Sequence, residues 1–218
     1  MFVYSGLGMG ATGALQGSLF ASGDEVGPGP LTPGDREDLG SGAWFEMVEG
    51  WMRGADTLFH ALVGSVPWRE ERRWMYERMV DVPRLVAFYD TGEELPQPAL
   101  GKALELLREH YADEGGGTLT TTGLCLYRGA RDSVAWHGDR IARDVDADAV
   151  VAIVSLGAPR RFLLRPKGGG SSLQLKPGAG DLLVLGGSCQ RTWEHCVPKS
   201  AHPVGPRLSV QFRSEEVG

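Results

Sequence analysis

A chain of 218 residues is long enough for one domain with a small appendage. Its hydrophobic fraction of 42% and charged fraction of 23% are ordinary for a globular protein and exclude wholesale disorder. The apolar runs are far shorter than the ~20 residues that span a bilayer, and three cysteines at irregular spacing do not form a disulfide framework. Because no Lys or Arg precedes Arg36, the N-terminus lacks the basic region of a secretory signal, and we expect a cytoplasmic protein.

The net charge of −6 argues against nucleic-acid binding on composition alone, but the charge is unevenly distributed. Residues 1–119 contain 9 Lys and Arg against 19 Asp and Glu, whereas residues 120–218 contain 13 against 9. The second half therefore has a surplus of positive charge that can face phosphate groups. The alternative is an ordinary solvated surface with no such partner.

The N-terminal segment is rich in residues that form turns. Its first 40 residues hold ten glycines and several prolines, many of them in segments 27–30 and 32–34. This composition predicts a loosely packed arm over residues 1–40, with at most a short strand near residues 15–21. Residues 41–218 are expected to form the folded domain.

Helical patterns occupy the middle of the chain. An apolar stripe predicts a helix over residues 55–63. Residues 68–79 contain aromatic side chains without a clean period, which predicts a second short helix or an irregular segment. The clearest helix is expected over residues 98–111, because Pro98 suits a first turn and leucines follow at helical spacing.

The rest of the chain has the pattern of short strands separated by glycine-containing turns. The expected strands are residues 118–127, 133–136, 150–156, 161–165, 171–175, 181–185, 191–197 and 207–213. Short strands at regular spacing indicate a β-sandwich or barrel. Helices followed by strands then predict an α+β chain whose second half is a jelly-roll-like barrel.

A histidine and an aspartate stand just after one of these predicted strands. His137 and Asp139 are separated by one residue, and on extended backbone residues i and i+2 point to the same side. His195 lies 58 residues after His137 on a late predicted strand. Two histidines and one carboxylate form the facial triad of non-haem Fe(II) oxygenases, which leaves open positions for a co-substrate and O₂. A hydrogen-bonded structural role is the other interpretation of each histidine.

Two arginines on the last predicted strand support the triad hypothesis. Arg207 lies 12 residues after His195, and an arginine that points into an apolar barrel needs an anionic partner. A dicarboxylate co-substrate is such a partner, because the guanidinium group binds a carboxylate through two parallel hydrogen bonds. Arg213 is six residues from Arg207, so both side chains can face the same side of one strand. Two surface arginines are the alternative.

Several motifs occur together in an order that resembles the AlkB family, the Fe(II)- and 2-oxoglutarate-dependent dioxygenases that repair alkylated nucleobases. They are Tyr127 and residues 136–139, 154–160, 180–184, 193–195 and 207–213. Residues 82–85 with Tyr89 are similar to the start of that family's nucleotide-recognition lid, expected here over residues 68–97. The resemblance covers residues 65–213. It implies an α+β fold with a double-stranded β-helix (jelly roll) core over residues 118–214, N-terminal helices and the lid.

The resemblance also implies a role for individual residues. His137, Asp139 and His195 would ligate Fe(II). The residues around 2-oxoglutarate would be Tyr127, Arg207, Ser209, Gln211 and Arg213, with Arg207 on the distal carboxylate. Contacts with the substrate would come from Arg84, Tyr89, Trp136 and Arg165.

The chain departs from the family pattern at three positions. Cys125 and Ser209 stand where the family often has asparagine. Ile141 stands where base-repairing members usually carry an acidic residue, a role that Asp144 or Glu194 would have to take here.

Other substrate contacts are open. The aromatic side chains that would stack on a flipped base are Phe88, Tyr89 or Trp68, each of which has core packing as its alternative role. Candidates for phosphate contact are Arg128, Arg131, Arg160, Arg161, Arg165 and Lys167, with surface solvation as the alternative.

The resemblance therefore implies oxidative dealkylation of N-alkylated bases in DNA, with RNA as a further possible substrate, by a monomer that needs no membrane. Fe(II) would be bound, O₂ and 2-oxoglutarate would be consumed, and aldehyde, succinate and CO₂ would be released. One alternative is a 2-oxoglutarate-dependent hydroxylase or demethylase of a protein or small molecule. Another is a non-catalytic jelly-roll binding module. The three cysteines are expected to be buried thiols, since Cys196 and His195 are neighbours on a strand and face opposite sides.

Overall fold

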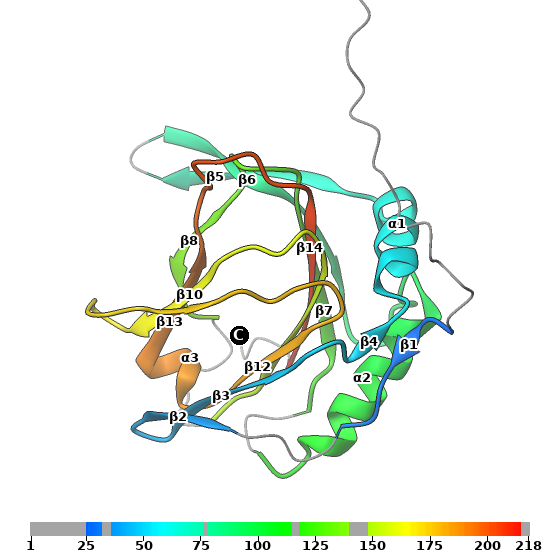
Figure 1. Ribbon diagram of the computed structural model, residues 1–218, viewed down its shortest axis with the longest axis horizontal. Coiled ribbons are helices and arrows are strands. Elements are labelled where there is room, and N and C mark those ends of the chain that lie inside the picture. The colour runs from blue at the N-terminus through cyan, green and yellow to red at the C-terminus, as the bar shows by residue number, and fades with distance from the viewer. Residues whose placement is uncertain (1–24, 32–35, 76–77, 115–117, 140–147, 215–218) are drawn as a thin grey trace, which may run out of the picture.

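The computed structural model describes residues 25–31, 36–75, 78–114, 118–139 and 148–214. Within these residues the chain forms a two-stranded sheet and two larger antiparallel sheets that face each other, and two longer helices pack outside the largest sheet (Figure 1). This sheet-rich architecture is consistent with the predicted jelly-roll core.

The elements up to the longest helix are β1 (Gly27–Pro28), β2 (Glu37–Gly40), β3 (Ala43–Val48), β4 (Met52–Arg53), α1 (Ala55–Ser65), β5 (Arg69–Met75), β6 (Arg78–Tyr89) and α2 (Pro98–His110). Those that follow are β7 (Thr121–Tyr127), β8 (Val134–His137), β9 (Val151–Gly157), β10 (Phe162–Pro166), β11 (Leu173–Leu175), β12 (Leu182–Gly187), α3 (Cys189–Thr192), β13 (Trp193–Val197) and β14 (Arg207–Arg213).

The larger sheet has eight strands in the order β2-β3-β12-β9-β14-β7-β6-β5, and the smaller has four in the order β11-β10-β13-β8. Strands far apart in sequence are neighbours in both sheets. In the larger sheet β14 lies between β9 and β7, and in the smaller sheet β13 lies between β10 and β8. This order brings the segments around residues 137, 195 and 207 into one region of the fold.

Strand periodicity divides the side chains of the larger sheet between two apolar cores. In β14, Leu208, Val210 and Phe212 join the core beneath the helices. The intervening residues of β14 point the other way, toward the smaller sheet, where they line a cavity. The predicted co-substrate residues on β14 therefore all carry odd residue numbers.

The helices cover the outer face of the larger sheet. α2 begins with Pro98 at its first turn and buries Leu100 and Leu107 against that face. α1 approaches the sheet closely at Gly157, where a Cβ atom would lie 2.9 Å from the Phe59 ring. Gly157 also has a φ of +78°, which only glycine adopts readily, so this contact requires a glycine.

Most of the expected elements are present. The helices predicted over residues 55–63 and 98–111 form α1 and α2, and each of the eight expected strand segments contains a strand, although the one at residues 191–197 begins only after the short helix α3.

The interpretation of residues 68–79 as a helix or an irregular segment is wrong, because residues 69–75 form β5. β5 pairs with β6 over most of its length, so the pairing, and not a local apolar pattern, determines this strand.

The glycine- and proline-rich segment also contributes strands that its composition does not predict. β1 pairs with β4, and β2 pairs with β3 at the edge of the larger sheet. The short strand expected near residues 15–21 lies outside the described residues. No helix in the described part of the chain is long and apolar enough to cross a membrane.

Candidate metal and co-substrate site

A cavity of about 540 Å³ lies between the two sheets. The smaller sheet and the segment after β8 contribute His137, Asp139 and His195 to its lining. The larger sheet contributes polar and apolar side chains to the lining. The polar ones are Arg84, Tyr127, Arg207, Ser209, Gln211 and Arg213. The three predicted metal ligands and all five predicted co-substrate residues therefore face the same space.

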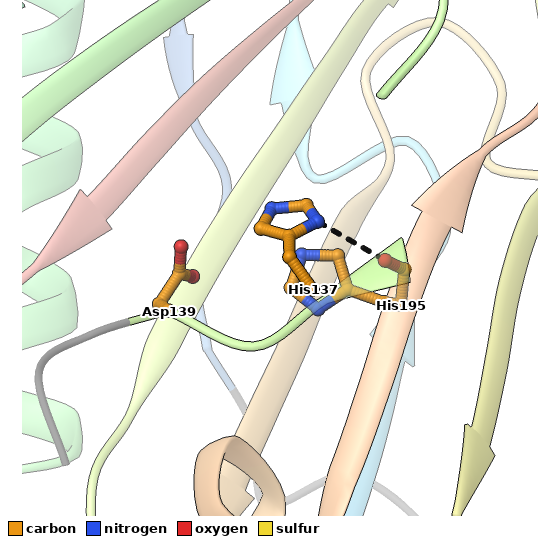
Figure 2. A group of neighbouring side chains, drawn as sticks. All are labelled: His137, Asp139 and His195. Atoms are coloured by element: carbon orange, nitrogen blue, oxygen red, sulfur yellow. Dashed lines mark hydrogen bonds between the residues drawn. The ribbon is translucent and has the colours of Figure 1, made fainter. Parts of the chain in front are cut away.

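The two histidines are brought together by strand pairing. His137 ends β8 and stands directly opposite His195 of β13, with ring centroids 4.3 Å apart. Asp139 follows two residues after His137, and Figure 2 shows the three side chains clustered. Their potential ligand atoms all lie within 4.8 Å of one another. This separation suits three donors around one metal ion.

Hydrogen bonds orient the His137 ring, and burial sets the protonation of His195. The Nδ1 atom of His137 lies 2.8 Å from the Ala135 carbonyl oxygen and 3.1 Å from that of His195, so it is placed to donate a hydrogen bond. The hydrogen bonds at Nδ1 leave Nε2 as the ring nitrogen that is available to a metal. His195 is buried and stacks on Phe162 at a centroid distance of 5.1 Å. Burial, assisted by His137, lowers the pKa of His195 to about 3, so its ring is neutral at pH 7.

Asp139 is held from two sides. Its backbone N–H donates to the Gln190 side-chain oxygen at 3.0 Å, and its carboxylate forms an ion pair with Arg213 at 3.2 Å. The intervening Gly138 allows close approach to α3, because a Cβ atom there would lie 2.7 Å from the Gln190 carbonyl oxygen. The carboxylate is therefore fixed on the same side as the two imidazoles.

The donor set fits a divalent metal such as Fe(II). Neutral imidazole nitrogen and carboxylate oxygen are ligands that non-haem iron uses, and three such donors on one side leave room for others. The three residues that would hold the metal are His137, Asp139 and His195.

Arg207 gives the cavity a buried positive charge. Its side chain is 2% exposed and donates to the Ser155 hydroxyl at 2.8 Å, while its Nε atom has no partner. None of the ion pairs among the described residues includes Arg207, and burial lowers its pKa. A buried guanidinium group without a counter-ion favours an anionic ligand, and a carboxylate matches its paired N–H donors.

Three predicted co-substrate residues form a chain of hydrogen bonds along β14. The Gln211 side-chain nitrogen donates to the Ser209 hydroxyl at 3.3 Å, and Arg213 donates to the Gln211 side-chain oxygen. Tyr127 is buried opposite Arg207 on the neighbouring strand β7, and burial raises the pKa of its hydroxyl. Its hydroxyl therefore stays protonated and can donate a hydrogen bond.

The four predicted substrate-contact residues lie in different places. Arg84 lines the cavity, whereas Tyr89 lines a neighbouring groove of about 350 Å³. Trp136 and Arg165 do not line the cavity. Arg165 instead lies 3.9 Å from the Trp136 ring centroid and pairs with Glu194 at 2.6 Å. Strand alternation explains this position, since Trp136 precedes His137 and faces the other side of β8.

Other candidates separate in the same way. Phe88 lines the cavity and is 59% exposed, whereas Trp68 packs against the core beneath the helices. Arg160 is buried and donates to three backbone carbonyls, so it is not free to contact phosphate. Ile141 and Asp144 lie outside the described residues.

Two site residues are missing from the sequence-based predictions. Phe162 packs on His195. Phe162 lies on a predicted strand, so the alternation of side chains along that strand was the sequence signal for its position. Gln190 contacts Asp139 across 51 residues, and no local pattern indicates that contact. All three cysteines are free and buried, as predicted, and only Cys125 of them lines the cavity.

Comparison with known proteins agrees with this geometry. The 2OG-Fe(II) oxygenase superfamily matches residues 90–213. The chain is 28% identical over 179 residues to the alpha-ketoglutarate-dependent dioxygenase alkB homolog 3 of Bos taurus, covering 75% of this chain and 62% of that protein. It is 29% identical to the human protein of that name over 73% of this chain and 61% of that protein.

The chain is also similar to a plant protein over a shorter segment. It is 33% identical over 132 residues to the DNA oxidative demethylase ALKBH2 of Arabidopsis thaliana, covering 50% of this chain and 42% of that protein. The chain thus spans less than two thirds of the length of these relatives. The matches confirm the resemblance to AlkB proteins, and the superfamily match covers more than half of the chain. The chain belongs to the 2OG-Fe(II) oxygenase superfamily.

Proposed function

We propose that this chain catalyses the oxidative dealkylation of N-alkylated bases in DNA or RNA, with Fe(II), O₂ and 2-oxoglutarate. The observation that carries the proposal is the meeting of His137, Asp139 and His195 with the unpaired Arg207 in one cavity. The similarity to a plant protein named as a DNA oxidative demethylase supports the choice of substrate.

The residues at one end of the cavity would hold the metal, and those at the other end would bind the co-substrate. His137, Asp139 and His195 would hold the metal, with His137 fixed by its Nδ1 hydrogen bond and Asp139 by Arg213 and Gln190. Arg207 and Tyr127 would bind the distal carboxylate of 2-oxoglutarate at the other end of β14. When bound, the iron and 2-oxoglutarate supply the oxidation of an N-alkyl C–H bond by O₂, with aldehyde, succinate and CO₂ as products.

The substrate base would enter from the side of the larger sheet that carries β5 and β6. We propose that this hairpin forms the nucleotide-recognition lid, because the exposed Phe88 of β6 lies at the cavity. A base reaches such a cavity only from a single strand or after extrusion from a duplex. Gly123 leaves room for this arrangement, since a Cβ atom there would lie 3.3 Å from the Phe88 ring.

The test is a panel of oligonucleotides with N1-methyladenine, N3-methylcytosine or ethenoadenine, as single-stranded DNA, duplex DNA and RNA. With Fe(II), ascorbate and 2-oxoglutarate, we expect at least one methylated oligonucleotide to lose its methyl group with equal release of formaldehyde. His137→Ala should abolish both. If the chain consumes 2-oxoglutarate on a protein or metabolite while every oligonucleotide stays unchanged, the proposed substrate class is wrong.

We further propose that the chain acts as a monomer in the cytoplasm. Three buried free thiols favour a reducing compartment. Among the described residues, the large apolar side chains that are exposed are Met47, Phe88 and Leu173, which come from different strands. Sedimentation of the full chain tests the monomer.

A further inference from the structure

Three arginines line the cavity, and they differ in their partners. Arg213 pairs with Asp139, whereas none of the ion pairs among the described residues includes Arg84 or Arg207. Arg84 comes from β6, in the hairpin that we propose as the lid. Its role is therefore open: it can serve the substrate or the co-substrate.

Sheet register places Arg84 beside the Arg207 end of the cavity. Leu85 of β6 pairs with Leu126 of β7, so Arg84, one residue earlier, stands beside Tyr127. Tyr127 in turn pairs with Arg207 of β14. Arg84, Tyr127 and Arg207 thus form a row across three adjacent strands, and all three line the cavity. Because Arg213 contacts Asp139, this row lies at the end of β14 away from the metal ligands.

The Arg84 guanidinium group makes few hydrogen bonds, although part of it is buried. One terminal nitrogen lies 3.4 Å from the Ser133 carbonyl oxygen, and the Nε atom is buried without a partner. Arg160, also beside Tyr127, differs because it donates to three carbonyls. The pKa of Arg84 is raised: burial opposes this, and Cys125, Tyr127 and Glu71 outweigh it. Arg84 therefore stays charged beside the Tyr127 hydroxyl.

We infer that Arg84 binds the distal carboxylate of the 2-oxo acid together with Arg207 and Tyr127. A carboxylate has lone pairs enough to accept from two guanidinium groups and one hydroxyl. Binding would supply the counter-ion that Arg207 lacks and an acceptor for the buried Nε of Arg84. The inference rests on the proposed function for the identity of the co-substrate. It also links the lid hairpin to occupancy of the co-substrate site.

The test compares two ligands that differ only at the distal group. 2-Oxopentanoate has a methyl group where 2-oxoglutarate has its distal carboxylate. Calorimetric titration of the Mn(II)-loaded protein measures the affinity of both for the unmodified chain, Arg84→Met and Arg84→Lys. Arg53→Met, a substitution of an exposed arginine on β4, is the matched control.

Arg84→Met should weaken 2-oxoglutarate about 10- to 100-fold, the range for a hydrogen bond to a charged group, and change 2-oxopentanoate less than about twofold. Arg84→Lys should recover part of the loss, and Arg53→Met should change neither ligand. Equal loss for both ligands would overturn the inference, because it would report a general distortion of the cavity. Unchanged affinity for 2-oxoglutarate with a raised KM for a methylated oligonucleotide would overturn it in favour of a substrate contact.

The result does not depend on finding the nucleic-acid substrate. Binding of 2-oxoglutarate that depends on Arg84, without turnover of any oligonucleotide, would support the inference and count against the proposed function. If the chain demethylates an oligonucleotide but Arg84→Met retains full affinity for 2-oxoglutarate, the proposed function is supported and the inference about Arg84 is wrong.

Discussion

Arg207 combines deep burial with the lack of any ion-pair partner among the described residues. An uncompensated buried charge destabilises a protein, and replacing it by an apolar side chain of similar length often increases stability. Arg207→Met should therefore leave the free energy of unfolding of the ligand-free protein unchanged or raise it by roughly 1–4 kcal/mol. The same substitution should remove the rise in Tm that 2-oxoglutarate causes. Urea unfolding and thermal shift measure the two effects, and a less stable variant would show that Arg207 has a structural partner.

Cys189 predicts an alkaline limit to stability. Burial, with a contribution from Asp139, raises the pKa of its thiol from 9.0 to about 12. The unfolded chain then loses a proton above pH 9 that the folded chain keeps, so stability falls from pH 9 toward pH 12. For this one group, the free energy of unfolding should drop by about 1.4 kcal/mol between pH 8 and pH 10.

Urea unfolding at the two pH values, compared with Cys189→Ala, isolates that contribution. Alanine has no thiol, so the variant should lose stability more gently over the same interval. An identical pH dependence in both proteins would mean that the thiol is not protected from ionisation.

Residue-level prediction from sequence succeeds where alternation and chemistry act together. His137, Asp139, Arg207 and Arg213 are spaced by even numbers within their segments, and the structure places all of them on the cavity. The same alternation argues against Trp136 in the cavity, because it precedes His137. The role of Gln190 could not be predicted from the sequence, because its contact with Asp139 depends on where α3 meets the segment after β8.

At the scale of elements, α3 supports the candidate metal site. This short helix carries Gln190, whose side chain accepts the Asp139 N–H, and its backbone packs against Gly138. Gln190→Ala should leave the fold intact but lower Mn(II) affinity about 10- to 100-fold, the usual cost of removing a group that orients a metal ligand. Gln174→Ala, an exposed glutamine on β11, is the control and should bind Mn(II) normally. Equal affinities in the two variants would assign the position of Asp139 to Arg213 alone.

The elements themselves were predictable to different degrees for a physical reason. α1, α2 and β9 carry their own apolar patterns, which face a core and can be read locally. β5 has the sequence Arg-Glu-Glu-Arg-Arg-Trp-Met, without such a pattern, and exists because β6 lies beside it. β1 and β2 likewise form by pairing with β4 and β3. Strands that depend on a distant partner leave little trace in their own residues.

At the scale of the whole molecule, the net charge of −6 has to be reconciled with a polyanionic substrate. Binding would have to use a local group of positive side chains. Arg131, Arg161 and Lys167 are exposed, and none of the ion pairs among the described residues includes them. Arg128, by contrast, is engaged with Asp132 and Glu70. The three free cations are therefore the best candidates for phosphate contact.

Salt dependence tests this assignment. Each phosphate contact on a single strand contributes a slope of about −0.7 to the dependence of log affinity on log salt. Three contacts then predict a loss of oligonucleotide affinity of roughly 20-fold between 50 and 200 mM salt. Changing Arg131, Arg161 and Lys167 to glutamine should remove a slope of about 2, whereas changing Arg53 and Lys102, on β4 and α2, should not. Affinity for 2-oxoglutarate should be the same in both variants, because its carboxylate binds inside the cavity. If the triple variant keeps the full slope, the phosphate backbone follows a different path across the surface.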